Sequence, residues 1–141
     1  MALQWTSTLS VGDEAIDAQH RELFARVDRL HDAMLRRERA EALRLLAFLR
    51  DYAVDHFEAE ERLMAETGYP EAAHHAREHE AFRAALRGLQ DHFEERGLTA
   101  ALVLDLERRV VGWLREHVYH SDVALGRWTR RERAPAPAGP G

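Results

Sequence analysis

Seven side chains that can bind metal ions occur in spaced groups along this chain of 141 residues. They are five histidines and two acidic residues: His20, His56, Glu60, His75, His79, His117 and Asp122. All but the first form the pairs His-x-x-x-Glu, His-x-x-x-His and His-x-x-x-x-Asp. Imidazole with carboxylate suits iron or zinc, and the chain has no cysteine to favour copper(I) or an iron–sulfur cluster. If one domain brings all seven together, they form a cage for two first-row metal ions.

The neighbouring residues indicate that these polar side chains point inward. His56 and Glu60 continue an apolar helical stripe, and His75 and His79 lead into another. Residues four apart share one face of a helix, so each pair points at one interior spot. A single histidine on a helix is more often a surface or core residue. Burying a whole cluster without partners, however, costs roughly 1–3 kcal/mol for each unsatisfied group, and metal satisfies such a cluster best.

The remaining four histidines lie off these stripes and are predicted to face solvent: His31, His74, His92 and His120. His120 lies near a helix end, three residues from the expected ligand His117. The pair Glu71-x-x-His74 matches one part of a ferritin-like di-iron site. That kind of site needs a second such pair and two further glutamates on partner helices. The sequence does not supply the complete set.

Four amphipathic segments carry the expected ligands. Apolar residues recur three and four positions apart over about 16–37, 41–65 and 71–95, and again after Thr99, which is a candidate N-cap. Gly68 and Pro70 end the second segment, and Gly97 ends the third. Short loops between long helices predict antiparallel neighbours. We therefore expect an all-α protein, an up-down-up-down antiparallel four-helix bundle.

The two ends of the chain differ from this pattern. Residues 1–12 are predicted to form an ordered N-terminal arm with Trp5 as its large anchor. Residues 130–141 end in a run of proline, alanine and glycine, which predicts a disordered tail. The expected organisation is thus one bundle domain over residues 1–129, followed by the tail.

Composition narrows the class of protein. A formal net charge of −5 argues against nucleic acid or an anionic membrane as the main partner. No secretory signal and no apolar run long enough to span a membrane are visible. The lack of cysteine fits a reducing compartment, so we expect a cytoplasmic protein.

Taken in order, the motifs resemble a bacterial hemerythrin. The resemblance rests on Ile16-Asp17-Ala18-Gln19-His20, His56-Phe57-Glu58-Ala59-Glu60-Glu61, Gly68-Tyr69-Pro70, His75-x-x-x-His79 and Trp113-Leu114-x-x-His117-x-x-x-x-Asp122. It covers about Trp5 to Trp128, nearly the whole chain. Any one of these motifs alone is weak, but their common order at helix-length separations is specific.

This resemblance implies a non-haem di-iron centre. One iron would be bound by His75, His79 and His117, and the other by His20 and His56. The carboxylates of Glu60 and Asp122 would bridge both ions, with an oxo or hydroxo group as the third bridge. Three histidines and three bridges fill six positions on the first iron. Two histidines and three bridges leave one position on the second iron open, where O2 would bind.

The expected function is therefore reversible O2 binding, in oxygen transport, storage or delivery, and not enzymatic turnover. Five neutral imidazoles give less electron donation than a carboxylate-rich site, and apolar surroundings withhold the protons that O–O cleavage needs. Residues beside the ligands are the candidates for the lining of the O2 pocket: Leu23, Phe24, Phe57, Trp113 and Leu114. Two other classes stay open. One is a peroxidase or oxidase of the same fold, and the other is a redox or O2 sensor or iron-handling protein acting through an unidentified partner.

The spacing of His117 and Asp122 makes a separate structural prediction. An α-helix turns about 100° per residue, so residues five apart lie about 140° apart around a regular helix. Asp122 would then point away from the metal that His117 binds. Ser121 and Asp122 are poor helix formers that compete for backbone hydrogen bonds. We therefore expect a break or a π-type turn between His117 and Asp122.

Overall fold

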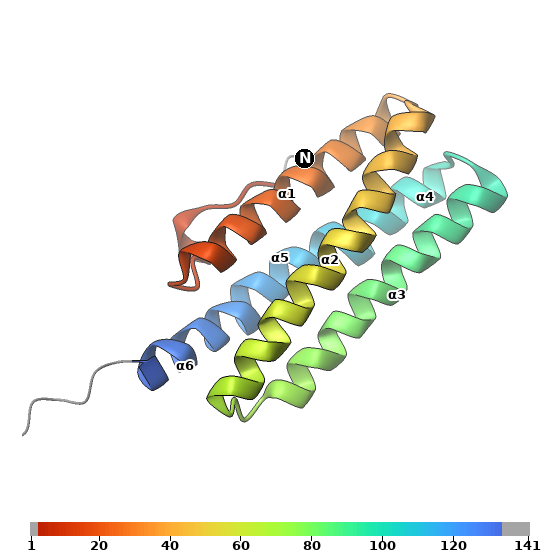
Figure 1. Cartoon of the computed structure of the whole chain (residues 1–141). Helices are drawn as coiled ribbons and strands as arrows, with labels where there is room; N and C mark the ends of the chain where they lie inside the picture. The colour runs from red at the N-terminus through yellow and green to blue at the C-terminus, as the bar shows by residue number, and fades with distance from the viewer. Residues whose placement is uncertain (1–2, 134–141) are drawn as a thin grey trace, which may run out of the picture.

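Four long helical rods, each antiparallel to the one before, make up the fold (Figure 1). The structure is a computed structural model that describes residues 3–133. Three rods are the α-helices α1 (Glu14–Leu35), α2 (Arg39–Thr67) and α3 (Ala72–Arg96). The fourth rod is continuous and comprises α4 (Ala100–Asp105), η2 (Leu106–Val111), α5 (Gly112–Glu116), η3 (His117–Asp122) and α6 (Val123–Arg133). The described residues contain no strand, so the predicted all-α four-helix bundle is confirmed.

Local chemistry explains where the rods begin and end. The Thr99 side chain accepts a hydrogen bond from the Leu102 backbone N–H at 3.0 Å and so caps the fourth rod, as predicted. Gly68 ends α2 in the left-handed conformation at φ 64°, which glycine adopts without a steric penalty. Asp13 caps α1 by accepting from the Ile16 N–H at 3.2 Å, a cap that was not predicted.

One apolar core runs along the bundle axis. Its large buried side chains come from α1, α2 and α3, and they include Phe24, Leu30, Leu46, Leu49, Phe82 and Phe93. Leucine and valine side chains of the fourth rod close the core from the remaining side. A second, smaller apolar cluster of Val11, Ile16 and Leu63 lies apart from it.

An N-terminal arm, residues 3–12, packs against the bundle and contains the short 3-10 turn η1 (Ser7–Leu9). Leu3, Leu9 and Val11 are buried, while Trp5 is only partly buried, so the arm has more anchors than the predicted one. The buried carboxylate of Asp17 accepts hydrogen bonds from Ser10 Oγ at 2.6 Å and the Val11 N–H at 2.9 Å. Hydrogen bonds and burial together fix the path of the arm.

The helical part of the chain extends further than predicted. Residues 130–133 belong to α6, although the predicted tail begins at residue 130. Arginine is a good helix former, and Arg130 also donates a hydrogen bond to the Val11 carbonyl at 3.0 Å. The first proline of the predicted tail is Pro135, which lies beyond the last described residue. The rest of the predicted tail, residues 134–141, lies outside the described residues.

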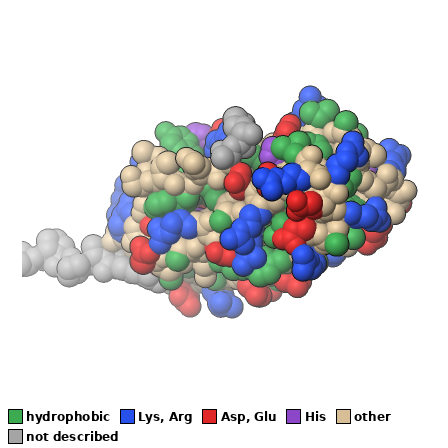
Figure 2. Space-filling model, turned by 90° about the horizontal axis from the view of Figure 1, so that it is seen from above, with side chains coloured by type: hydrophobic (Ala, Val, Ile, Leu, Met, Phe, Trp, Pro, Cys, Tyr) green, Lys and Arg blue, Asp and Glu red, His purple; other side chains and the backbone are tan. Residues whose placement is uncertain are grey.

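The surface is mixed in charge on the face that Figure 2 shows, with arginine and acidic side chains interspersed among apolar ones. Among the helices within residues 3–133, none combines the length and the hydropathy that a membrane span requires.

Candidate metal centre

All seven predicted ligand residues meet inside the bundle. They come from all four rods, and each has at most 4% of its surface exposed: His20, His56, Glu60, His75, His79, His117 and Asp122. Their nitrogen and oxygen atoms form two groups whose members lie within 4.8 Å of one another. The first group holds His75, His79 and His117, the second holds His20 and His56, and Glu60 and Asp122 belong to both.

Each carboxylate divides its two oxygens between the two groups. Glu60 Oε1 lies 3.2 Å from His75 Nε2 and 3.0 Å from His79 Nε2. Its other oxygen, Oε2, lies 3.5 Å from His20 Nε2 and 3.4 Å from His56 Nε2. Glu60 therefore offers one donor atom to each side.

Asp122 repeats this division. Its Oδ1 lies 3.0 Å from His75 Nε2 and 3.1 Å from His117 Nε2, whereas its Oδ2 lies 3.0 Å from His20 Nε2. Metal–ligand bonds of about 2.1 Å at right angles place neighbouring donor atoms about 3.0 Å apart. The observed separations of 3.0–3.5 Å are close to that edge length. The arrangement has the geometry of a dicarboxylate-bridged pair of metal sites.

The hydrogen bonding of these atoms supports the same reading. Several of the donor atoms are buried and have no hydrogen-bond partner: His20 Nε2, Glu60 Oε2, His117 Nε2, Asp122 Oδ1 and Asp122 Oδ2. Some of these atoms lie only 3.0–3.1 Å apart, but they are not aligned as donor and acceptor. Leaving such groups unsatisfied costs roughly 1–3 kcal/mol each. Glu60 Oε1, by contrast, is hydrogen-bonded to Nε2 of His75 and of His79. The five atoms that converge at contact distance without a hydrogen bond fit metal ligands.

The fourth rod widens where the geometry requires it. η3, His117–Asp122, is a π-helical segment, and it brings Asp122 back to the side of the rod that carries His117. The prediction of a π-type turn between these two residues is confirmed. A second π-helical segment, η2, was not predicted.

In the metal-free centre the surroundings favour the protonated form of three of the imidazoles, those of His20, His75 and His117. Burial lowers the pKa of His117, but Asp122 and the other nearby carboxylates raise it further, to about 10. The same competition raises the pKa of His20 and of His75 to about 9. His79 differs, because burial lowers its pKa more than Glu60 raises it.

The pKa values of the two carboxylates, Glu60 and Asp122, shift in the opposite direction. Burial raises the pKa of Glu60, but His56 and then His20 lower it more, so that the net pKa is well below the usual range. The pKa of Asp122 is lowered likewise by His117 and His20, against burial and the charge of Glu60. Both groups are therefore carboxylates at neutral pH. A metal ion that binds here must displace protons from the histidines.

Partners outside the ligand set hold three of the five histidine rings. His56 Nδ1 lies 2.7 Å from Gln19 Oε1, His79 Nδ1 lies 3.3 Å from Glu61 Oε1, and His117 Nδ1 lies 2.8 Å from Glu78 Oε2. Such contacts fix each ring so that its Nε2 points at the carboxylates of Glu60 or Asp122, where a metal would bind.

These three partners follow a rule that sequence reasoning missed. Gln19, Glu61 and Glu78 are each adjacent in sequence to a ligand on their own helix, and each binds a ligand histidine on the next helix. A polar residue beside a ligand was the signal available in the sequence.

Aromatic side chains pack directly on the ligand rings. Phe57 stacks on His79 with ring centroids 4.0 Å apart, and Trp113 stacks on His117 at 4.4 Å. The other predicted pocket residues, Leu23, Phe24 and Leu114, are buried in the main core. Trp113 also lines a surface pocket of about 260 Å³ that reaches His117.

The four histidines predicted to face solvent divide into two kinds. His74 and His120 are exposed, as predicted. The prediction is wrong for His31, which is 7% exposed and pairs through Nε2 with Glu107 Oε1 at 2.9 Å. His92 is partly buried against Thr99, with Nε2 2.7 Å from the hydroxyl. The face of His31 was read as polar because Glu107, which covers it, lies 76 positions away in sequence. The partner of His92 lies only seven positions away, at the start of the fourth rod.

Comparison with known proteins gives consistent results. The family described as "Hemerythrin HHE cation binding domain" matches residues 11–126. A bacteriohemerythrin of Stenotrophomonas maltophilia is 40% identical over 80 residues, which are 57% of this chain and 52% of that protein. The chain thus spans about half the length of that relative.

Two further matches cover more of the fold. A bacteriohemerythrin of Methylococcus capsulatus is 34% identical over 110 residues, which are 78% of this chain and 82% of that protein. A crystal structure of a hemerythrin mutant superposes with a TM-score of 0.80 at 31% identity, covering 92% of this chain and 98% of that chain.

Proposed function

Because this chain belongs to the hemerythrin family, we propose that its buried donors hold two iron ions and bind O2 reversibly, as an oxygen carrier or store. The observation that carries the proposal is the unequal donor count. One group offers three histidines and two carboxylate oxygens, whereas the other offers two histidines and two carboxylate oxygens. If an oxo or hydroxo group bridges the two ions, the first group has six donors and the second has only five. The two-histidine side is therefore where a small ligand finds room.

Residues of the chain itself would bind the metal ions and hold the ligand rings in place. Glu60 and Asp122 would hold two metal ions side by side, because each offers one oxygen to either group. Phe57 and Trp113 fix the rings of His79 and His117 by stacking. When bound, two ferrous ions would supply the two electrons that O2 takes up.

Buried apolar side chains next to the ligands oppose irreversible oxidation. Leu23, Phe24 and Leu114 have at most 1% of their surface exposed. A lining of buried apolar side chains excludes water and so limits the supply of protons, which O–O cleavage requires. This supports reversible binding over turnover as the role of the site.

The proposal is tested by one optical experiment on iron-loaded protein. Anaerobically reduced protein should be nearly colourless, gain a visible absorption band in air, and lose it again under argon through several cycles. The matched control is His79→Ala, which removes one donor from the filled side.

Other results would exclude the proposal. Continuous O2 consumption with a simple reductant would show an oxidase, and rapid turnover of peroxide would show a peroxidase. Protein that binds two irons without forming the band would favour an iron-handling role.

A further inference from the structure

The groups just outside the ligand set differ between the two halves of the centre. On the three-histidine side, both supporting partners are carboxylates. Glu78 Oε2 lies 2.8 Å from His117 Nδ1, and Glu61 Oε1 lies 3.3 Å from His79 Nδ1. Two of the three histidines on this side therefore contact a carboxylate through Nδ1.

The two-histidine side has no such charge within the described residues. His56 Nδ1 contacts the neutral amide oxygen of Gln19 at 2.7 Å. His20 Nδ1 is buried without a hydrogen-bond partner. The buried carboxylate of Asp17 is on the same helix, but its oxygens accept from the N-terminal arm instead.

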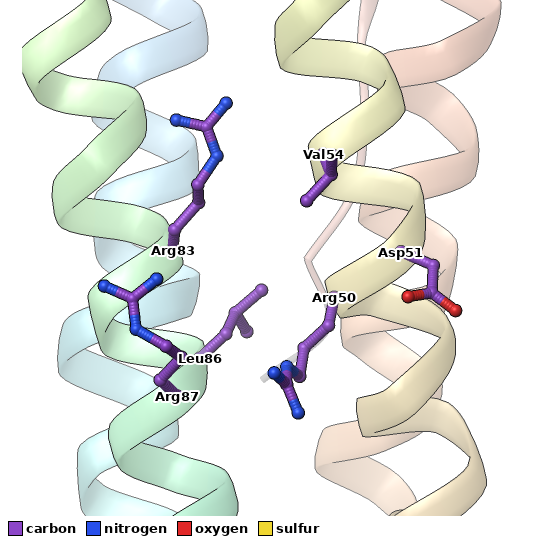
Figure 3. A pocket seen from close by; sticks show the side chains of 6 residues that line it. All are labelled: Arg50, Asp51, Val54, Arg83, Leu86 and Arg87. Atoms are coloured by element: carbon purple, nitrogen blue, oxygen red, sulfur yellow. The ribbon is translucent and has the colours of Figure 1, made fainter.

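Both carboxylates are held in place by further contacts. Ser121 Oγ donates to Glu78 at 2.7 Å, and His74 Nε2 lies 3.3 Å from it. Glu61 Oε2 lies 3.7 Å from an Arg83 guanidinium nitrogen. Figure 3 shows Arg83 on α3, where it lines a pocket of about 130 Å³ between α3 and α2. Arg83 offsets part of the charge of Glu61, so Glu78 is the stronger of the two partners.

A carboxylate that accepts the Nδ1 proton makes an imidazole a more basic ligand. More basic ligands favour Fe(III) over Fe(II). We propose that Glu78, assisted by Glu61, makes the three-histidine side the more easily oxidised half of the centre. In half-oxidised protein the ferric ion then lies with His75, His79 and His117, and the ferrous ion lies with His20 and His56. The inference rests on the proposed di-iron function and assigns Glu61, Glu78 and Gln19 as positioning residues for it.

This asymmetry complements the open position. The side that has room for O2 keeps the ferrous state longer, while the filled side is the better electron donor. The neutral amide of Gln19 is part of this asymmetry. A carboxylate at position 19 would bring the reduction potentials of the two sides closer together.

The test is the separation between the two one-electron reduction potentials of the iron-loaded protein. Glu78→Gln and Glu61→Gln keep a hydrogen-bond acceptor and remove the charge, so they should raise mainly the lower potential. Gln19→Glu adds a charge and should lower mainly the higher potential. Both changes should narrow the separation, although they alter the net charge in opposite directions. Glu78→Gln should shift the relative Fe(III) preference of the two sides by about tenfold or more, which is 59 mV for a one-electron couple.

Glu58→Gln is the matched control. Glu58 is exposed on α2 between two ligands, so this variant should leave the separation unchanged. If Glu78→Gln leaves the separation unchanged, or if Gln19→Glu widens it, the inference is overturned while the proposed function stands. If the separation narrows as expected but no reversible O2 band forms, the inference stands without the O2 role.

A second measurement does not require iron. Titration of metal-free protein with cobalt(II) should show a tighter and a weaker site, and Glu78→Gln should weaken the tighter one by about 10- to 100-fold. Protein that binds neither iron nor cobalt overturns both proposals.

Discussion

Among single residues, the orientation of the imidazole rings decides what the centre can bind. Every predicted ligand histidine directs Nε2 at a carboxylate oxygen of Glu60 or Asp122. His120 lies only three residues from His117, yet its ring faces outward and pairs with Glu116 at 3.1 Å. Position relative to the bundle axis, more than residue type, separates the expected ligands from other histidines.

The first prediction follows from that separation. His79→Ala removes a buried donor and should lower the iron content from about two ions per chain to one or none, measured by elemental analysis after loading with excess iron. His120→Ala removes an exposed imidazole and should leave the content at two. Equal iron contents in the two variants would contradict the assignment of His79 as a ligand.

The second prediction concerns the pH dependence of metal-free protein. The pKa of His20 and of His75 is raised from 6.5 to about 9, and that of His117 to about 10. Groups whose pKa is raised by folding stabilise the fold fully below 6.5 and lose that contribution as the pH rises through 9–10. Metal-free protein should therefore be less stable at pH 9 than at pH 6, by at least about 1–2 kcal/mol, since one pKa unit corresponds to about 1.4 kcal/mol.

Urea unfolding of metal-free protein at the two pH values measures this difference. Iron-loaded protein is the control, because metal replaces the protons and removes the loss. On the acid side, the lowered pKa of Glu60 and Asp122 means that their contribution is lost below about pH 4. Equal stability of metal-free protein at pH 6 and pH 9 would show that the imidazoles are not protonated in the fold.

Among the structural elements, the helices and their caps were predictable because their signals are local. Apolar residues three and four apart, Gly68, Gly97 and Thr99 gave boundaries within about two residues of those observed. The π-helical segment η3 was also predictable, because five-residue spacing on one face conflicts with a regular helix. The segment η2 carries no such conflict in its sequence. It lies where Glu107 reaches His31, a contact over 76 positions that no local pattern reveals.

The third prediction tests the role of η3 directly. A π-type turn is one residue inserted into an α-helix. Deletion of the exposed Tyr119 should therefore convert η3 into regular helix, place the two ligands four residues apart, and retain two irons per chain. Deletion of the exposed Glu58 from regular α2 should rotate Glu60 away from His56 and abolish iron binding. Elemental analysis and circular dichroism of both deletion variants measure the outcome, and loss of iron in the Tyr119 deletion alone would show that the wide turn itself is required.

Over the whole molecule, the centre is enclosed from two sides. The main core covers the side of Phe57 and Leu114, and the N-terminal arm covers the other. The arm closes a gap beside Glu60 and Asp122 that leaves no room for a water molecule, lined by Val11, Ile16, Leu63, Leu125 and Gly126. The sequence predicted an ordered arm but not what it covers, since the contact joins residues more than a hundred positions apart.

The last prediction tests whether this closure depends on Gly126. A Cβ added there would lie 2.2 Å from the Val11 carbonyl oxygen, which is backbone and cannot rotate away. Gly126→Ala should therefore push the arm off α6 and destabilise the protein by about 1–3 kcal/mol, the usual range for overpacking. Gly88→Ala is the matched control, because its Cβ would meet only an arginine nitrogen at 3.6 Å in the interior of α3. That variant should raise the stability by roughly 0.5–1 kcal/mol through helix propensity. Thermal melts of metal-free protein measure both effects.

In iron-loaded protein, a displaced arm would also admit water beside Glu60 and Asp122, so Gly126→Ala should speed irreversible oxidation in air while Gly88→Ala leaves its rate unchanged. Faster oxidation in both variants, or in neither, would mean that the arm does not keep the carboxylate side dry.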